Sequence, residues 1–379
     1  MQQDDFFKIA QNQFNDALPF VLYSKPNTSV LSGMFQKDTV VYTSENLLDN
    51  GFVFAPFDSR NKTVLIPAKH SNLLETKFII PTKNREIENS AKLIYNGSKE
   101  KALDIAKEFH INLVLKAINT IKAAIFKKVV LSRKEDVTLS EKNPIKLFKR
   151  LLSQYQTAFV YCWYHPKIGL WLGATPETLL SVTGNRFTTM ALAGTQAFKG
   201  DENPSWETKE TEEQQLVANY LVSNLQYVVK SFKVADIETI KAGNLLHLRT
   251  RVSGILNSNL KTIVDTLHPT PAVCGLPKAT AKQFILKHEN YKREFYTGFL
   301  GELNMVEKIT RNTNRRNVEN SAYNSVKTVS NLFVNLRCMQ LTDEKASIYI
   351  GGGITKDSIA EKEWEETVNK TQTMKKVLF

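Results

Sequence analysis

Two carboxylates and an amine near the C-terminus are spaced so that one helix would hold them together. Glu363 and Glu366 are three residues apart, and Lys370 follows Glu366 by four residues. Residues three or four apart share a face of an α-helix. The preceding strand ends in Gly351-Gly352-Gly353, and we expect these glycines to form a turn with bare backbone beside the helix. This indicates a functional site; the alternative is a solvated helix face with one Glu–Lys pair.

A second acidic helix is predicted to begin near Thr208. Glu213 is followed at three, four and seven residues by apolar or aromatic side chains, Leu216, Val217 and Tyr220, whereas Glu210 and Glu212 fall on other faces. A carboxylate in register with a core needs a base, a proton or a metal, because an unpaired buried charge is costly. If Glu213 meets Glu363 and Glu366, Mg²⁺ is the natural ion, since oxygen ligands without His or Cys suit a hard cation.

Lys128 and Glu177 are the candidates for acid–base chemistry. Lys128 opens the β-forming run Lys128–Arg133, in which alternation turns its side chain inward and that of Lys127 outward. Desolvation lowers the pKa of a lysine, as a base requires, and apolar surroundings keep a carboxyl protonated, as an acid requires. Glu177 follows Pro176 in such an apolar segment. The alternatives are an ordinary strand-end lysine and a Pro-Glu turn whose side chain lies in water.

Three other segments place polar side chains among apolar ones. Arg337 lies in the run Leu332–Met339, which we expect to be one strand, and there it would pair with a substrate carboxylate. The segment Ala191–Thr195 offers small residues, free amides and a hydroxyl that could hold a carboxylate. His247 and His268 stand in apolar contexts, where single histidines are more often structural than catalytic.

The composition is that of a globular protein. The chain has 379 residues, of which 42% are hydrophobic, enough for one large or two medium domains. It has no apolar run of about 18 residues and no signal-peptide pattern at its start, so we expect a cytoplasmic protein without a membrane segment. Its three cysteines, which are not in metal spacing, are expected to be reduced: Cys162, Cys274 and Cys338.

The formal charge of +12 allows an acidic partner, either a nucleic acid or a small dianionic substrate. One denser basic patch occurs within residues 302–331, at Lys308, Arg311, Arg315 and Arg316. It lacks the interleaved aromatic residues that stack on bases, so we interpret it as a long solvated loop. A nucleic-acid binding protein remains the alternative from a different functional class.

The hydrophobic pattern predicts an α+β fold. A helical stripe starts at Ile111 and includes Val114, Leu115, Ile118, Ile121 and Ile125. Thr183-Gly184-Asn185 has hairpin spacing, which favours antiparallel pairing. The predicted strands are Phe20–Tyr23, Gly51–Ala55, Thr63–Pro67, Lys128–Arg133, Ala158–Tyr164, Leu170–Leu172, Leu179–Val182, Arg186–Ala193, Leu332–Leu341 and Ala346–Ile350; further helices are predicted at Pro144–Leu152, Glu210–Val229 and Ala279–His288.

Together these segments resemble the chorismate-utilising enzymes, whose members form isochorismate, salicylate, anthranilate or aminodeoxychorismate. The resemblance covers residues 96–379, which we take as the catalytic region; residues 1–95 match weakly and are expected to be a β-rich N-terminal part of the same domain. It is carried by Lys128–Arg133, Thr175–Leu180, Leu192–Thr195, Glu210–Val217, His247–Thr250, His268–Pro277, Arg293–Gly301, Arg337 and Gly351–Lys370. The resemblance implies a single large domain with two antiparallel β-sheets flanked by helices.

Two positions choose the nucleophile in this family. Lysine before Val-Val-Leu-Ser-Arg, here Lys128, is typical of members that use water, whereas members that use ammonia usually have glutamine there. Members that form aminodeoxychorismate usually have a lysine where this chain has Ala193. The resemblance therefore implies formation of isochorismate, for menaquinone or siderophore synthesis, with salicylate as the alternative product and no glutaminase subunit. It also implies a monomer that acts on chorismate and binds no nucleic acid.

The resemblance also assigns roles by position. Lys128 would activate water for attack at C2 of the ring, and Glu177 would protonate the hydroxyl that leaves C4. Glu213 and Glu366 would bind Mg²⁺, with Glu363 acting through water. The residues implied to contact the substrate are Gly194, Thr195, His247, Thr250, Tyr296, Arg337, Gly351, Gly352 and Lys370.

The chain departs from the family pattern at three places. Ala191 stands where proline is common, Arg249 is bulkier than usual, and the segment between Gly301 and Leu332 is longer than in many relatives. None of these positions is a proposed acid, base or metal ligand. They bear on pocket details and surface partners, not on the reaction.

Overall fold

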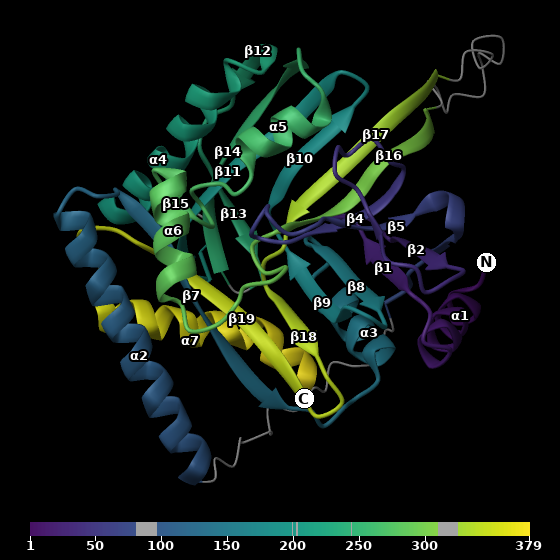
Figure 1. Ribbon diagram of the computed structural model, residues 1–379, viewed down its shortest axis with the longest axis horizontal. Coiled ribbons are helices and arrows are strands. Elements are labelled where there is room, and N and C mark those ends of the chain that lie inside the picture. The colour runs from purple at the N-terminus through teal and green to yellow at the C-terminus, as the bar shows by residue number, and fades with distance from the viewer. Residues whose placement is uncertain (81–96, 199, 202–203, 244, 310–324) are drawn as a thin grey trace.

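A computed structural model describes residues 1–80, 97–198, 200–201, 204–243, 245–309 and 325–379. The described strands form two large sheets, and every pair of neighbouring strands is antiparallel. The predicted α+β class, with two antiparallel sheets flanked by helices in a single domain, is confirmed (Figure 1).

The nine-stranded sheet has the order β15-β7-β19-β18-β9-β8-β1-β2-β6. It contains strands from both ends of the chain, because the N-terminal β1 pairs with β8 and the C-terminal β18 pairs with β9, the neighbour of β8. Its strands are β1 (Phe20–Ser24), β2 (Val30–Gln36), β6 (Ser71–Lys77), β7 (Lys128–Thr138), β8 (Phe159–His165), β9 (Gly169–Thr175), β15 (Gly275–Leu276), β18 (Cys338–Leu341) and β19 (Lys345–Ile354).

The ten-stranded sheet has the order β12-β14-β11-β10-β17-β16-β4-β5-β3, with β13 also paired to β14. Its strands are β3 (Tyr42–Thr43), β4 (Gly51–Ala55), β5 (Val64–Pro67), β10 (Thr178–Thr183), β11 (Arg186–Ala197), β12 (Val229–Val234), β13 (Glu238–Ala242), β14 (Leu245–Leu256), β16 (Phe299–Ile309) and β17 (Ser325–Val334). Residues 1–80 thus supply strands to both sheets, and the expected boundary at residue 95 lies outside the described residues.

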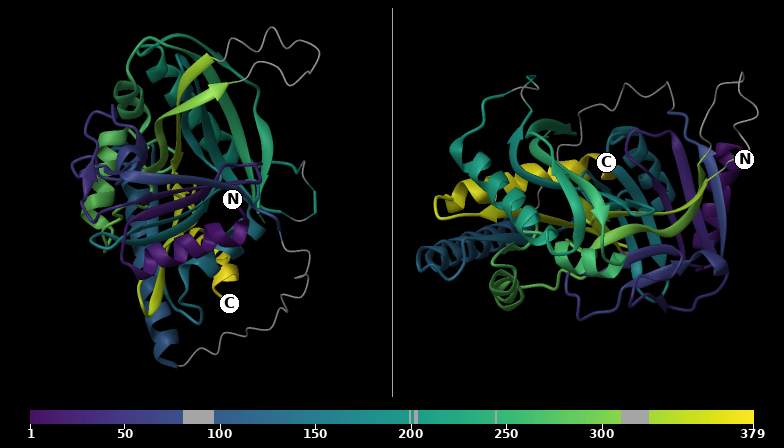
Figure 2. Two further views of the ribbon diagram at one scale, coloured as in Figure 1. Left: turned by 90° about the vertical axis from the view of Figure 1, so that its right-hand side faces the viewer. Right: turned by 90° about the horizontal axis from the view of Figure 1, so that it is seen from above.

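The helices cover the outer faces of the two sheets (Figure 1 and Figure 2). α7 packs on β19, α2 packs on α7 and β7, and α4 packs on β11 and β14 of the other sheet. The helices are α1 (Gln3–Asn15), α2 (Gly97–Lys122), α3 (Pro144–Gln154), α4 (Thr208–Leu225), α5 (Leu260–Leu267), α6 (Lys278–His288) and α7 (Ala360–Leu378), with a short 3₁₀ turn η1 at Ala68–His70. None of the described helices combines the length and apolar character needed to cross a membrane.

Alternation along the strands explains how the sheets pack against each other. In β8, Phe159, Tyr161 and Trp163 join the aromatic core between the sheets, whereas Val160 and Cys162 face the helices on the other side. Phe159 stacks on Phe333 of the facing sheet, with ring centroids 4.1 Å apart. Since β8 is buried on both faces, its sequence is almost continuously apolar.

Most predicted elements are confirmed, with differences at their ends. The predicted helix Glu210–Val229 is α4 and stops at Leu225, and the helix predicted from Ile111 is the last part of α2. Leu115 and Ile125 do not belong to the buried stripe, since they are 46% and 55% exposed.

Three predicted features are wrong. Gly351–Gly353 do not form a turn but lie within β19, paired with β7. Arg337 is not inside one long strand, because the chain breaks between β17 and β18 and Arg337 has a φ of +46° there. Residues 302–309 and 325–331 of the expected loop 302–331 are strand, since β16 ends at Ile309 and β17 starts at Ser325, and residues 310–324 lie outside the described residues. The side chains of Arg311, Arg315 and Arg316 lie outside the described residues.

Candidate active site

Glycines of β19 let acidic side chains approach the sheet closely. A Cβ added to Gly353 would stand 2.4 Å from Oε1 of Glu213 and 3.2 Å from Cε of Lys128. A Cβ on Gly352 would meet carboxylate oxygens of Glu363 and Glu366 at 3.5 and 3.7 Å. Any side chain at Gly353 would therefore displace the carboxylate of Glu213.

The three carboxylates predicted as metal ligands lie near these glycines, and each forms an ion pair with a lysine. Nζ of Lys128 lies 2.8 Å from Oε1 of Glu213, but it has no well-angled hydrogen bond within the described residues. The second pair is Lys209 with Glu363 at 2.7 Å, and the third is Lys370 with Glu366 at 2.6 Å. Two of these pairs join different elements, since Lys128 is on β7, Lys209 and Glu213 are on α4, and Glu363 is on α7.

The lysines and neighbouring carboxylates shift the pKa values of two of the acids in opposite directions. Burial raises the pKa of Glu213, but the effects of Lys128, Lys370 and Lys209 together outweigh burial, so the net pKa is lowered. Burial and the neighbouring Glu366 raise the pKa of Glu363, and Lys209 only partly offsets them. Glu363 is thus a buried acid whose negative charge is compensated only in part by Lys209.

The donor set fits a hard cation. Oε2 of Glu363 and Oε2 of Glu210 are buried and accept no hydrogen bond from the described residues. All the candidate ligands are carboxylates, which suit Mg²⁺. Within the described residues, however, no three His, Cys, Asp or Glu side chains are gathered into a ready metal site. The lysine pairs explain this, because each orients its carboxylate toward an ammonium group instead of a shared centre.

Glu177 has the protonation state of a general acid. It sits in the turn between β9 and β10, where its backbone N–H donates to Thr175 Oγ1 and its carbonyl accepts from Val334 N–H. Only 2% of the residue is exposed, and burial raises the pKa of Glu177 to about 8, although the charge of Lys128 lowers it. The carboxyl is therefore mostly protonated at neutral pH, and it interacts electrostatically with Lys128.

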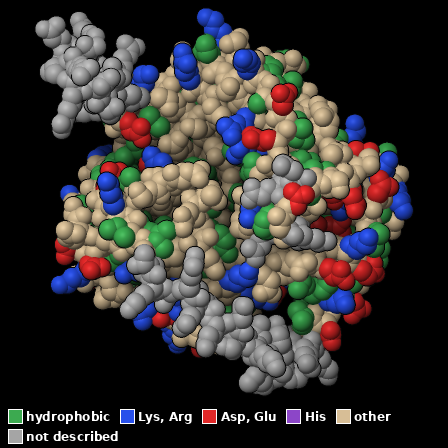
Figure 3. Space-filling view, turned by 180° about the vertical axis from the view of Figure 1, so that it is seen from behind, with side chains coloured by type: hydrophobic (Ala, Val, Ile, Leu, Met, Phe, Trp, Pro, Cys, Tyr) green, Lys and Arg blue, Asp and Glu red, His purple; other side chains and the backbone are tan. Residues whose placement is uncertain are grey.

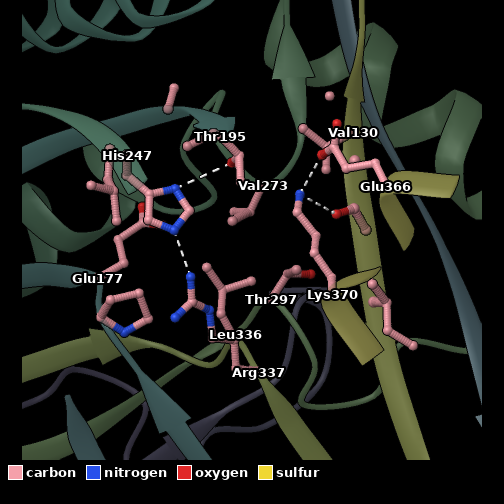
Figure 4. A pocket seen from close by; sticks show the side chains of 18 of the residues that line it. Val130, Glu177, Thr195, His247, Val273, Thr297, Leu336, Arg337, Glu366 and Lys370 are labelled. Atoms are coloured by element: carbon pink, nitrogen blue, oxygen red, sulfur yellow. Dashed lines mark hydrogen bonds and ion pairs between the residues drawn. The ribbon is translucent and has the colours of Figure 1, made fainter. Parts of the chain in front are cut away.

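Arg337, His247 and Thr195 form a hydrogen-bonded row on another wall (Figure 4). Nη2 of Arg337 lies 2.5 Å from Nε2 of His247, and Nδ1 of His247 lies 3.2 Å from Thr195 Oγ1 and 3.1 Å from the carbonyl of Gly194. Burial and the charge of Arg337 lower the pKa of His247, so the imidazole is neutral. Burial lowers the pKa of Arg337 to about 10. With no carboxylate partner in the described part of the chain, this guanidinium suits an incoming anion.

Arg293 fixes the positions of three segments around the site. It forms a two-point ion pair with Glu289 at 2.6 and 2.8 Å and donates to the carbonyls of Val130 and Val273 at 2.7 and 3.0 Å. Its Nη1 also donates to Thr297 Oγ1 at 3.2 Å. Val130, Val273 and Thr297 all line the cavity, so Arg293 shapes its wall without entering it.

Replacing Arg293 by methionine should lower the free energy of unfolding by about 3–5 kcal/mol, because Glu289 would remain buried without its cation. Urea unfolding followed by circular dichroism measures the loss. The control is Arg60→Met, since Arg60 pairs with Asp58 at 2.6 Å but is 77% exposed. Equal losses in the two variants would show that burial of the Arg293 pair is unimportant.

The structure brings most of the predicted site residues to one cavity. The predicted residues that line it are Glu177, Gly194, Thr195, Glu213, His247, Tyr296, Arg337, Gly351, Gly352, Glu366 and Lys370. Lys128 and Glu363 lie directly behind the lining, in contact with Glu213 and Lys209. Thr250 is not part of the lining; its hydroxyl accepts a hydrogen bond from Gln214 at 3.2 Å.

Sequence reasoning missed Lys209 and Glu210, both of which line the cavity. Glu210 was placed on another face of its helix, yet its Cβ lies 3.2 Å from the position of a Cβ on Gly194. A signal for Lys209 was available, because it precedes Glu213 by four residues and so shares its helical face. The inward face of α4 is therefore wider than the apolar stripe indicated.

Comparison with known proteins identifies the class of protein. Two family models, both described as chorismate binding enzyme, match residues 63–308 and 322–376. The chain belongs to the chorismate-binding enzyme family.

Individual relatives narrow the comparison. Isochorismate synthase MenF of Escherichia coli K12 is 28% identical over 278 residues, 70% of this chain and 59% of MenF. Isochorismate synthase EntC of the same organism is 30% identical over 259 residues, 65% of this chain and 61% of EntC. The chain thus spans about three fifths of the length of these relatives. The crystal structure of DhbC from Bacillus anthracis shares the fold, with a TM-score of 0.74, 23% identity and coverage of 98% and 99% of the two chains.

Proposed function

We propose that this protein is an isochorismate synthase, an isomerase that converts chorismate to isochorismate with Mg²⁺. The observation that carries the proposal is a protonated buried acid, Glu177, that interacts electrostatically with the buried amine of Lys128 around one cavity lined by anion-binding groups. The similarity to MenF and EntC supports it. On the face shown in Figure 3, Lys and Arg are interspersed with Asp and Glu and do not form the continuous basic stripe of a nucleic-acid binder.

Lys128 would act as the base that activates water. Its Nζ is fully buried, and Glu213 is the charged group beside it. Ala193 also lines the cavity, and its methyl side chain supplies no amine that would compete as a nucleophile. Once the ammonium group that pairs with Glu213 has released its proton, the neutral amine of Lys128 would accept a proton from water as the water oxygen bonds to C2 of the ring.

Glu177 would complete the reaction as the general acid. As the C2–O bond forms, the two ring double bonds shift and the C4–O bond breaks. Glu177 gives its proton to the departing hydroxyl, which leaves as water. One water enters and one leaves, and the proton taken by Lys128 balances the proton given by Glu177, so the overall reaction is an isomerisation.

Cationic and small residues would hold the two substrate carboxylates. Arg337 and Lys370 would take the enolpyruvyl carboxylate together with the backbone at Gly351, whose carbonyl already accepts from Lys370 at 3.0 Å. Gly194 and Thr195 would seat the ring carboxylate. His247 would lie beside the ring and Tyr296, buried in the aromatic core, would form its wall. Glu213 and Glu366, with Glu363 through water, would hold Mg²⁺, which when bound neutralises the ring carboxylate.

A product assay tests the proposal. Purified protein incubated with chorismate and Mg²⁺ should form isochorismate, detected by chromatography, without free pyruvate. Stoichiometric pyruvate and fluorescent salicylate would instead assign salicylate synthase activity on the same site. No change in chorismate, together with tight and salt-sensitive RNA binding, would refute both.

The use of the product is also part of the proposal. MenF is described as menaquinone-specific, and EntC and DhbC are further isochorismate synthases among the relatives. The product would accordingly supply menaquinone or siderophore synthesis. We expect the protein to act as a monomer in the cytoplasm, without a glutaminase subunit.

A further inference from the structure

Lys209 is a cavity residue with no role in the reaction described above. It lies on the first turn of α4, and its side chain reaches Oε1 of Glu363 on α7 at 2.7 Å. Glu363 is 2% exposed, and its other oxygen has no hydrogen-bond donor in the described structure. Burial lowers the pKa of Lys209, but its contact with Glu363 and the charges of Glu366 and Glu213 together outweigh burial, so the net pKa is raised.

The charges around Glu363 are nearly balanced without a metal ion. Four carboxylates lie along this wall, those of Glu210, Glu213, Glu363 and Glu366, and three ammonium groups lie beside them, those of Lys128, Lys209 and Lys370. The formal charge of the cluster is therefore about −1 when all these groups are ionised. A divalent cation that enters must break lysine pairs, and the energy of those pairs is subtracted from its affinity.

Of the three lysines, Lys209 is the one best placed to give way. Lys128 is fully buried, and Lys370 is also bound to the carbonyl of Gly351. Lys209 has 29% of its side chain exposed and lines the cavity, so it can leave Glu363 and turn toward a ligand. An anionic substrate in the cavity would then offer Lys209 a new partner.

We propose that Lys209 is an internal counterion that competes with the divalent cation for Glu363 and thereby couples cation binding to binding of the dianionic substrate. Without substrate, Lys209 holds Glu363 and keeps cation affinity low. With substrate, Lys209 pairs with the bound anion and releases Glu363 to the cation. The cation then binds more tightly when the substrate is bound, and the substrate binds more tightly when the cation is bound, by the same factor. This inference rests on the proposed function for the identity of the anion.

Binding of Mn²⁺, observed by electron paramagnetic resonance, tests the competition without any turnover. In the absence of substrate, Lys209→Met should bind Mn²⁺ about tenfold more tightly than the unmodified protein, whereas Lys209→Arg should stay close to it because the charge is kept. The matched control is Lys345→Met, since Lys345 pairs with Asp136 at 2.5 Å on the surface, away from the cavity. Unchanged or weaker Mn²⁺ binding by Lys209→Met would overturn the proposal.

The coupling is tested in a background that cannot turn over. In Glu177→Gln, chorismate should lower the dissociation constant of Mn²⁺, and the additional change Lys209→Met should reduce that effect by about tenfold. Thermal unfolding gives a second readout: Mn²⁺ should raise the melting temperature of Lys209→Met more than that of the unmodified protein. An undiminished chorismate effect in the double variant would refute the coupling.

These outcomes separate the inference from the proposed function. If the unmodified protein leaves chorismate unchanged but Lys209→Met still binds Mn²⁺ more tightly, competition stands and the isochorismate assignment falls. If isochorismate forms but Lys209→Met binds Mn²⁺ no better, the assignment stands and Lys209 has no competing role.

Discussion

Lys128→Ala should lower kcat by about 10²–10⁴-fold, the contribution typical of a positioned base, while substrate affinity changes little. Substrate affinity should change little because Lys128 is fully buried behind Gly353 and Glu213. It does not line the part of the cavity that would hold the substrate carboxylates. Steady-state kinetics of isochorismate formation and direct binding of chorismate measure the two quantities.

Two further variants make this result interpretable. Lys127→Ala removes the neighbouring exposed lysine and should leave both quantities unchanged. Lys128→Gln keeps most of the side-chain volume, so a similar loss of kcat in a variant with an unchanged melting temperature excludes misfolding as the cause. Full activity of Lys128→Ala would refute the assigned role.

Glu177→Gln should also lower kcat by about 10²–10⁴-fold, because the amide has the shape of the acid but no proton to give. The pKa of Glu177 is about 8, so the acid is protonated below that pH and ionised above it. The kcat of the unmodified protein should therefore fall as the pH rises through about 8.

The residual activity of Glu177→Gln should lack this decline. Stability provides an independent check, because the folded pKa is raised from 4.5 to about 8. The stabilisation linked to this proton is complete below pH 4.5 and is lost as the pH rises through about 8. The unfolding free energies of the two proteins should therefore diverge over that interval. A decline of the residual rate near pH 8 in Glu177→Gln would assign the titration to another group.

The α+β class and many element positions could be predicted from the sequence because periodicity is a local property. Strands that are buried on both faces, such as β8, stand out as apolar runs, and Gly184 marks the hairpin between β10 and β11 with a φ of +62°. The approach of Glu213 to Glu363 and Glu366 could also be predicted from the sequence. Helical spacing showed which side of its helix each carboxylate occupies, and a buried charge requires a partner.

The errors have a common physical origin in tertiary pairing. Three consecutive glycines favour a turn locally, but pairing with β7 extends β19 through them and the approach of carboxylates excludes side chains. Arg337 looked like part of a strand because its neighbours are apolar, whereas the structure uses a break to aim it at His247. The spacing of Lys209 to Glu213 gave its helical face, but its pairing with Glu363, 154 residues away, could not be predicted locally.

α4 rests on the ten-stranded sheet and α7 on the nine-stranded sheet, so the Lys128–Glu213 and Lys209–Glu363 pairs also fasten the two halves of the sandwich to each other. Recognition of the ligands and mechanical cohesion of the molecule consequently depend on the same few charges. Any substitution that changes those charges will therefore alter both the strength of the contact between the two sheets and the affinity of the site for its ligands.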